Sequence, residues 1–234
     1  MVYLCGDTHG FIDTQKIEKW AQDKTFTPKD ILIILGDSGI LWSKGDNDVI
    51  NFWKQFPFYT FFIDGNHDNH ELIDNLPDVN GFGYVANKIY HLKRGKVYKI
   101  AGKNFFTFGG GVSIDKNMRK EGISYWKREL PSYMELKNGI ENLARYNFKV
   151  DYVLTHTAPM QVASKILKIL EIEGQSISYN EEENGLRNYF SSLIEDYNLK
   201  FNAWYFGHFH TDRTIYWNYH KFHCLYNSEP VRIT

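Results

Sequence analysis

Short apolar runs that end in polar, glycine-containing turns recur along this chain of 234 residues. The runs at Val2–Cys5, Ile31–Leu35 and 58–63 are continuous rather than alternating, which is typical of strands buried on both faces. Helix-like stretches at 14–24 and 48–56 separate them, so the first part of the chain is predicted to form a parallel α/β layer. An open sheet of this kind carries its functional side chains at the carboxyl ends of its strands.

The rest of the chain has no internal repeat, low-complexity tract or linker. Helices are predicted at 159–172 and 181–197, and the segment at 112–149 has a mixed character. Further strands, several of them joined by glycine turns, are predicted at 89–92, 96–100, 104–108, 152–155, 203–206, 214–217, 222–226 and 231–233. We therefore expect a single α/β domain over residues 1–234 with both parallel and antiparallel strands.

Five of the predicted strands end in turns that carry metal-binding types of side chain. Asp7 and His9 are two residues apart, so their side chains project to the same side of an extended strand end, and His208 and His210 repeat this spacing. The polar side chains in these turns are Asp7, His9, Asp37, Asn66, His67, His156, His208 and His210. Such a mixture of donors suits Mn, Fe or Zn better than Ca or Mg alone. Glycines beside these residues allow sharp turns and close approach of the backbone to an ion.

The composition argues against several classes of protein. With 27 Lys and Arg against 28 Asp and Glu, the formal charge is −1, which does not suit a protein that coats nucleic acid or an anionic membrane. Two cysteines, Cys5 and Cys224, are too few for a disulfide framework, and both are expected to pack as small buried side chains. No signal-peptide pattern and no apolar stretch of ~20 residues is present, so we expect a cytoplasmic protein without a membrane partner.

In order along the chain, the five turns resemble the five motifs of the calcineurin-like metallophosphoesterases. The motifs are Asp7-x-His9, Gly36-Asp37, Gly65-Asn66-His67-Asp68, His156 and Gly207-His208-x-His210. A glycine-rich block at 109–119, followed by Tyr125 and Trp126, resembles a block in small bacterial and phage members of the superfamily. The resemblance implies a four-layer α/β/β/α sandwich in which two mixed β-sheets are flanked by helices.

The resemblance also implies two divalent metal ions, with Mn favoured over Fe or Zn. One ion would be held by Asp7, His9, Asp37 and His210, and the other by Asp37, Asn66, His156 and His208, with Asp37 bridging. The expected reaction is hydrolysis of a phosphate mono- or diester by in-line attack of a metal-bridging hydroxide. His67 would not bind metal but would face the substrate, as the acid for the leaving group or as a donor to developing charge.

Two positions depart from the best-known branches of the family. Ile40 and Leu41 stand where protein Ser/Thr phosphatases and dinucleoside-polyphosphate hydrolases carry an acidic residue and an arginine. The usual partner that orients His67 and the usual phosphate-binding arginine are therefore missing, which makes a protein Ser/Thr phosphatase a less favoured interpretation. Arg119, near the glycine run at 109–111, is the candidate to contact substrate phosphate instead.

Three kinds of function remain open from the sequence. A phosphoesterase acting on a small phosphate ester, nucleotide-like esters included, is favoured, and a nuclease or nucleic-acid phosphatase is the alternative. An inactive scaffold is disfavoured because every expected ligand position holds a competent residue. No obligatory protein partner is inferred. Aromatic residues make up 17% of the chain, and Trp42, Tyr125 and Trp126 are candidates to wall the pocket and stack on a base.

The remaining polar residues are expected to have structural roles. Asp68 is predicted to support a loop or a ligand histidine. The acidic run at 181–183 is interpreted as the solvated first turn of a helix. The histidines outside the motifs, which we expect to be surface or packing residues, are His70, His91, His220 and His223.

Overall fold

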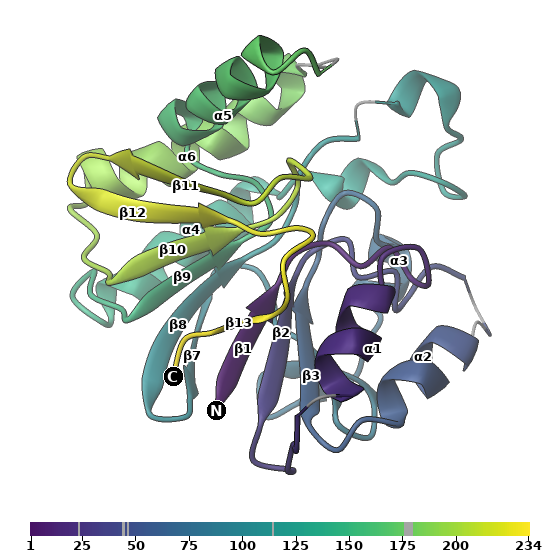
Figure 1. The fold of residues 1–234 in the computed structure, drawn as a ribbon. Coiled ribbons are helices and arrows are strands. Elements are labelled where there is room, and N and C mark those ends of the chain that lie inside the picture. The colour runs from purple at the N-terminus through teal and green to yellow at the C-terminus, as the bar shows by residue number, and fades with distance from the viewer. Residues whose placement is uncertain (23, 44, 46, 114, 176–179) are drawn as a thin grey trace.

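Two β-sheets pack face to face in the computed structural model, which describes residues 1–22, 24–43, 45, 47–113, 115–175 and 180–234 (Figure 1). The first sheet contains β1 (Val2–Cys5), β2 (Ile31–Leu35), β3 (Tyr59–Ile63), β4 (Asp78–Val79), β5 (Phe82–Ala86), β6 (Ile89–His91) and β13 (Val231–Arg232). The second contains β7 (Lys96–Ile100), β8 (Lys103–Phe108), β9 (Tyr152–Thr155), β10 (Ala203–Phe206), β11 (Arg213–Trp217) and β12 (His220–Cys224).

Each sheet has a parallel centre and antiparallel edges. The strand order is β13-β1-β2-β3-β6-β5-β4 in the first sheet and β11-β12-β10-β9-β8-β7 in the second. The neighbours β1, β2, β3 and β6 pair in parallel, and so do β8, β9, β10 and β12. As a result, the carboxyl ends of the central strands in each sheet lie along one edge of that sheet.

Helices cover the outer face of each sheet (Figure 1). On the first sheet, α1 (Gln15–Gln22) and α2 (Asn47–Lys54) bury Ile17, Trp20, Val49 and Trp53 against the strands. On the second sheet the covering helices are α4 (Tyr133–Ala144), α5 (Met160–Ile172) and α6 (Asn184–Glu195). A short helix, α3 (His70–Asp74), follows β3, and 3-10 turns occupy Lys116–Met118, Lys127–Glu129 and Glu181–Glu183. Within the described residues, no helix combines the length and apolar character needed to cross a membrane.

The continuous apolar runs are explained by burial on both faces. In β2, Leu32 and Ile34 pack under α1 and α2, whereas Ile33 and Leu35 point into the space between the sheets. In β10, Trp204 and Phe206 pack toward the helices, and Ala203 and Tyr205 face the other sheet. Side chains alternate between two buried layers, so neither face of a central strand needs polar residues. This arrangement confirms the predicted four-layer α/β/β/α sandwich with two mixed sheets.

The helices α3 and α4 and the strands β4 and β5 were absent from the sequence-based prediction. The segment described as mixed contains α4, whose start is marked by a capping box in which Ser132 and Glu135 satisfy each other's backbone N–H groups. The hairpin of β4 and β5 turns at Asn80 and Gly81, an Asn-Gly pair typical of such turns. These two signals are local and readable in the sequence, so α4 and this hairpin were missed because apolar runs were given more weight than caps and turns.

Candidate metal centre

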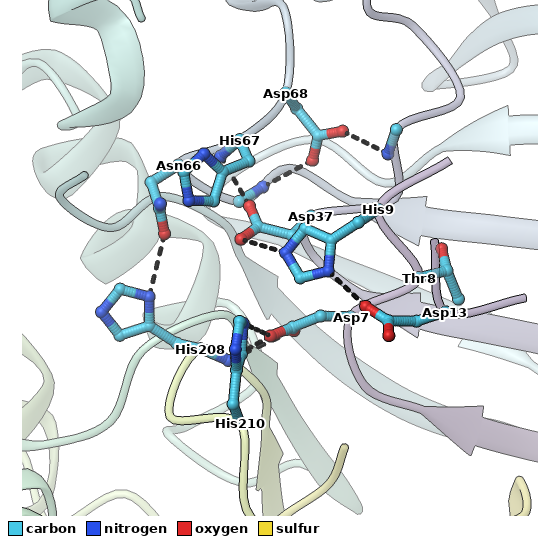
Figure 2. Close-up of polar contacts among 12 residues, drawn as sticks. Asp7, Thr8, His9, Asp13, Asp37, Asn66, His67, Asp68, His208 and His210 are labelled. Atoms are coloured by element: carbon cyan, nitrogen blue, oxygen red, sulfur yellow. Dashed lines mark hydrogen bonds and ion pairs between the residues drawn. The ribbon is translucent and has the colours of Figure 1, made fainter. Parts of the chain in front are cut away.

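The predicted ligand residues come from the strand ends of both sheets and meet where those ends converge. Asp7, Asp37 and Asn66 follow β1, β2 and β3 of the first sheet. From the second sheet, His156 follows β9, and His208 and His210 follow β10. Figure 2 shows how closely the side chains from the two sheets lie. The sequence therefore placed these residues correctly at strand ends, and the docking of the sheets brings the two sets together.

Asp37 lies at the centre of this group. Its Oδ2 atom is 3.4 Å from His9 Nε2 and also 3.4 Å from His156 Nε2. Its other oxygen, Oδ1, accepts a hydrogen bond of 2.6 Å from the backbone N–H of His67. The side chain is 1% exposed, so both oxygens are committed to groups of the site. One carboxylate thus stands between imidazoles from opposite sheets, as a bridging ligand would.

The first half of the site contains Asp7, His9 and His210. Their potential ligand atoms all lie within 4.8 Å of one another, with Asp7 Oδ2 3.2 Å from His210 Nε2. Asp13 Oδ2 is 2.7 Å from His9 Nδ1, which turns the Nε2 atom of that ring toward Asp37 (Figure 2). His210 stacks on the ring of Tyr226 with a centroid distance of 4.5 Å, although its side chain is 48% exposed. This half of the site faces solvent through His210.

The second half of the site contains Asn66, His156 and His208. The amide oxygen of Asn66 lies 2.9 Å from His208 Nδ1 and 3.0 Å from His156 Nε2. His156 Nδ1 donates to the Leu35 carbonyl at 2.8 Å, so its Nε2 atom is the one directed into the site. The carboxylate, amide and imidazole atoms that suit a borderline metal therefore converge in both halves, and a divalent cation fits the donor set.

Four of the seven predicted ligands have left-handed backbone conformations. The φ angles are 43° at His9, 49° at Asp37, 71° at His208 and 46° at His210. Such a conformation costs roughly 1–3 kcal/mol for each non-glycine residue and persists only where the surroundings enforce it. Here the backbone N–H of His9 donates to the Asp37 carbonyl at 2.8 Å, which ties two of these turns together. The loops hold the ligand side chains in place at the expense of local strain.

Glycines in the motifs make room for neighbouring ligands. Gly36 has a φ of 90°, and a Cβ atom there would lie 2.2 Å from His156 Nδ1. A Cβ atom at Gly207 would lie 2.2 Å from Asp7 Oδ1. In each case the ligand comes from the opposite sheet. Glycine is thus required for the close contact of the two sheets, in addition to the turn geometry expected from the sequence.

Charge is unevenly distributed in the site. Burial lowers the pKa of His156, but Asp37 and Asp7 outweigh it and raise that pKa to about 10. The pKa of His9 rises to about 9 because Asp37, Asp7 and Asp13 outweigh its burial. The carboxylates therefore draw protons onto these rings when no other cation is close. Since histidine binds a metal in its neutral form, a divalent ion in the site would take the place of those protons.

His67 differs from the other histidines of the site. Burial lowers its pKa, Arg119 and His9 lower it further, and Asp37 opposes them. Its ring centroid lies 5.8 Å from that of His9, and it borders cavities on both sides of the site. Its backbone N–H donates to Asp37, which fixes the turn that carries the ring but does not orient the ring itself. Ile40, which occupies that partner's position, is fully buried in the apolar core under α1 and α2.

Arg119 lies beside His67 but already has partners. Its Nε atom is 2.6 Å from Asp115 Oδ1, and its Nη1 atom donates to the Ser124 carbonyl at 2.9 Å. It lines one of the cavities that His67 borders. Of the neighbouring glycine-rich block, Ile114 lies outside the described residues. In the glycine run of that block, a Cβ atom at Gly111 would lie 3.0 Å from Asn66 Oδ1, so the run packs against a predicted ligand.

The sequence interpretation missed Glu183, which supports His208. Glu181 and Glu182 are exposed, as expected of a solvated turn, but Glu183 is buried, which corrects the interpretation for that residue. Its Oε1 atom lies 3.3 Å from His208 Nε2, and its Oε2 atom pairs with Arg187 four residues later. Burial raises the pKa of Glu183, but His208 and Arg187 outweigh it and lower the pKa to about 2. The Glu183–Arg187 spacing on a helix was the available sequence signal.

Asp68 supports the loops around Asp37, as expected. It accepts hydrogen bonds from the backbone N–H groups of Ser38, Gly39 and Gly65, at 3.3, 3.1 and 2.9 Å, and from the Ser38 hydroxyl at 3.0 Å. It therefore joins the turn after β2 to the turn after β3 (Figure 2).

The histidines outside the motifs fall into two groups. His70 and His91 are buried, in agreement with a packing role, and they pack beside Asp64 and Arg94 in a polar cluster that the sequence did not reveal. His220 and His223 are partly buried and stack on Phe201 and Tyr205, with centroid distances of 4.3 and 4.8 Å, in agreement with a packing role. Cys5 and Cys224 are buried and free, as expected.

The three candidate aromatic residues have different environments. Trp42 is partly exposed and lines the same cavity as His67 and Arg119. Trp126 is buried behind it and packs edge-on, with a centroid distance of 5.4 Å. Tyr125 lies under the ammonium group of Lys116, which is 5.4 Å from its ring centroid. Of the three, Trp42 is therefore the residue in place to contact a ligand beside His67.

Comparison with known proteins agrees with this geometry. A curated relative, the lariat debranching enzyme of Schizosaccharomyces pombe, is 28% identical over 209 residues, which cover 79% of this chain and 43% of that protein. The chain thus spans less than half the length of this relative.

Solved structures share the fold at low identity. The phosphopantetheinyl hydrolase of Mycobacterium tuberculosis matches with a TM-score of 0.52 at 13% identity, over 97% of this chain and 89% of that one. The TT1561 protein of Thermus thermophilus also matches with a TM-score of 0.52 at 13% identity, over 97% and 90% of the two chains. The family model described as calcineurin-like phosphoesterase matches residues 1–212. The chain therefore belongs to the calcineurin-like phosphoesterase family.

Proposed function

We propose that this chain hydrolyses a phosphate mono- or diester at a centre of two divalent metal ions, Mn favoured over Fe or Zn. Asp7, His9 and His210 would hold one ion, Asn66, His156 and His208 the other, and Asp37 would bridge them. The observation that carries the proposal is the position of Asp37 Oδ2, 3.4 Å from an imidazole nitrogen in each half of the site. Ions bound there would neutralise phosphate charge and lower the pKa of a water molecule.

The residues around the centre have separate tasks. His67 can hydrogen-bond the charge that develops on the leaving oxygen, or give that oxygen a proton when its ring is protonated. Arg119 is the candidate for contact with phosphate oxygens on the same side, since it lines a cavity with His67. Asp13 and Glu183 hold the rings of His9 and His208 by the nitrogens that face away from the centre.

A nuclease or nucleic-acid phosphatase is the second candidate. The similarity to the lariat debranching enzyme favours it, while the formal charge of −1 gives it no general electrostatic support. A comparison of mononucleotide and oligonucleotide substrates separates the two candidates.

Asp37→Asn is the direct test. The amide keeps the size of the side chain but is a poor bridging ligand, so we expect the metal content to fall and kcat/KM to drop at least about 100-fold. Hydrolysis of p-nitrophenyl phosphate and of its bis ester, with Mn added, would be measured alongside metal analysis. Asp78→Asn, at an exposed carboxylate paired with Lys93, is the matched control and should leave both readouts unchanged. Full activity of Asp37→Asn, or activity that survives thorough chelation, would contradict the proposal.

A further inference from the structure

A cavity of about 400 Å³ opens beside the proposed metal centre. His9 and His67 form its boundary with the centre, and Arg119 lies in the same wall. The remaining walls are mainly apolar and include Phe11, Ile12, Trp42 and Val49, and we call this space the Trp42 cavity. Its size falls in the range of cavities that hold small organic ligands.

The apolar walls of the Trp42 cavity are exposed beyond what core packing explains. The exposed fraction is 54% for Phe11 and 78% for Ile12, although both are large apolar residues next to a polar site. Exposed apolar groups that gather at a cavity mark a binding surface more often than isolated ones do. Their position beside His9 means that a molecule bound through its phosphate would also touch them.

The aromatic walls pack against neighbouring rings. Phe11 packs edge-on against Phe52, with a centroid distance of 5.8 Å and an angle of 81° between the rings. Trp42 packs edge-on against the buried Trp126 at an angle of 90°, and its carbonyl accepts a 2.8 Å hydrogen bond from Asn69 Nδ2. Rings that are already packed in this way can stack on a flat aromatic ligand, or meet its edge, with little loss of conformational entropy on either side. A flexible aliphatic chain would lose more conformational entropy on binding to the same rings.

We propose that the Trp42 cavity binds a flat aromatic group on the leaving alcohol of the substrate, so that the enzyme prefers aryl or similar ring-bearing phosphate esters. This inference rests on the proposed function, because His67 is the proton donor to the leaving oxygen and borders the cavity. In the reaction, the oxygen of water bonds to phosphorus and the bond from phosphorus to the ester oxygen breaks. That ester oxygen takes a proton from the protonated His67 ring, and the proton that the water gives up returns to His67. The ring-bearing alcohol is then released from the cavity.

Competitive inhibition by phosphonates tests the cavity without turnover of the probe. Naphthylphosphonate, phenylphosphonate, hexylphosphonate and methylphosphonate share the metal-binding head and differ only in the group offered to the cavity. We expect the wild-type enzyme to bind naphthylphosphonate most tightly and methylphosphonate most weakly. Trp42→Ala should lose about ten-fold in affinity for the aromatic probes and little for methylphosphonate. Trp42→Phe should keep part of the preference, and Tyr133→Ala, at an exposed aromatic residue on α4, should keep all of it.

The possible results separate this inference from the proposed function. Equal binding of hexyl- and naphthylphosphonate, or no preference for naphthyl- over methylphosphonate, overturns the aromatic subsite while leaving the phosphoesterase intact. An equal loss for all four probes in Trp42→Ala, with an unchanged melting temperature, also overturns it, because the residue would then act on the phosphate head. Failure of every phosphonate to inhibit an active, metal-loaded enzyme overturns both the subsite and the proposed metal–phosphate contact.

Discussion

The structure contains two groups in which buried carboxylates face histidines, and the carboxylates of the two groups are neutralised in different ways. In the proposed metal centre, Asp7 and Asp37 form their ion pairs with the imidazoles of His9, His156 and His210. In the second group, Asp64 faces His91 and His70 but also Arg94, whose Nη2 atom lies 2.6 Å from Asp64 Oδ2. We call this second group the Asp64 cluster.

The guanidinium of Arg94 explains the difference. It carries a permanent charge, and it also donates to the Arg128 and Glu129 carbonyls at 2.9 and 3.2 Å. The Asp64 cluster is thus neutralised by the protein itself and ties β3 to the segment that leads into α4. The metal centre has imidazoles where the cluster has a guanidinium, and imidazoles can exchange their protons for a metal. The same residue types therefore have a structural role in one place and, in the proposed function, a cation-binding role in the other.

The largest effect is expected when the Arg94 guanidinium is removed from the Asp64 cluster, which tests the structural role of that cluster. Arg94→Met should lower the free energy of unfolding by about 3–5 kcal/mol, because it leaves Asp64 buried without its permanent countercharge. Urea denaturation in the presence of a chelator measures this without any contribution from metal. The double variant Asp64→Asn/Arg94→Met should recover part of the loss. An Arg94→Met protein as stable as the wild type would show that the imidazoles alone neutralise Asp64.

A somewhat smaller loss of stability is expected when the pH is lowered, because acid protonates His70 in the same cluster. Burial lowers the pKa of His70 to about 4, with Arg94 adding to the shift, whereas the pKa of an unfolded histidine is about 6.5. The unfolded chain therefore binds more protons between these values, so this contribution is present above about pH 6.5 and is lost as the pH falls toward 4. The loss amounts to about 3 kcal/mol.

The variant His70→Asn isolates the contribution of His70 to the loss of stability in acid. It should be less sensitive to acid than the wild type when both are unfolded by urea at pH 7 and pH 4.5 in the presence of a chelator. If the two proteins lose stability in parallel over this interval, His70 is not the group that takes up the proton.

The smallest effect concerns the support of the metal centre. Glu183→Gln keeps the shape of the side chain but removes the charge beside His208 Nε2, so we expect the metal affinity of the second half of the site to fall about 10- to 100-fold. Competition for Mn against a chelator of known affinity provides the measurement. Glu182→Gln, at the exposed neighbour that pairs with Lys116, is the matched control. A similar change in both variants would point to general electrostatics instead of a specific contact with His208.

The sequence predicted the parts of the site that depend on local pattern. The apolar run of β2 followed by Gly36 and Asp37 fixed both the strand and the position of the ligand, because burial on two faces and a strand-end turn are local properties. The order of the five motifs then supported the family and the four-layer fold. Neither inference required knowledge of which turns meet in space.

The residues that the sequence did not reveal depend on contacts across the fold. Glu183 reaches His208 only because the turn before α6 packs against the strand end of β10, 25 residues later in the chain. Arg94 reaches Asp64 from the segment after β6, and nothing in its own neighbourhood marks it as buried. Asp13 was closer to detection, since it follows His9 by four residues in a motif already identified. Such partners follow from tertiary packing, which local propensity does not encode.

The contacts at Gly36 and Gly207 have a thermodynamic consequence. Each sheet supplies only part of the ligand set, and these glycines are where a residue of one sheet touches a ligand from the other. A cation that needs both sets binds the docked pair of sheets and not the separated ones, so cation binding and sheet docking are linked equilibria. At a free cation concentration 100 times its dissociation constant, this linkage adds about 2.7 kcal/mol to the stability of the docked state. A cation bound in the proposed active site would then also stabilise the contact between the two sheets. The stability of the fold would therefore depend on the concentration of free metal ion.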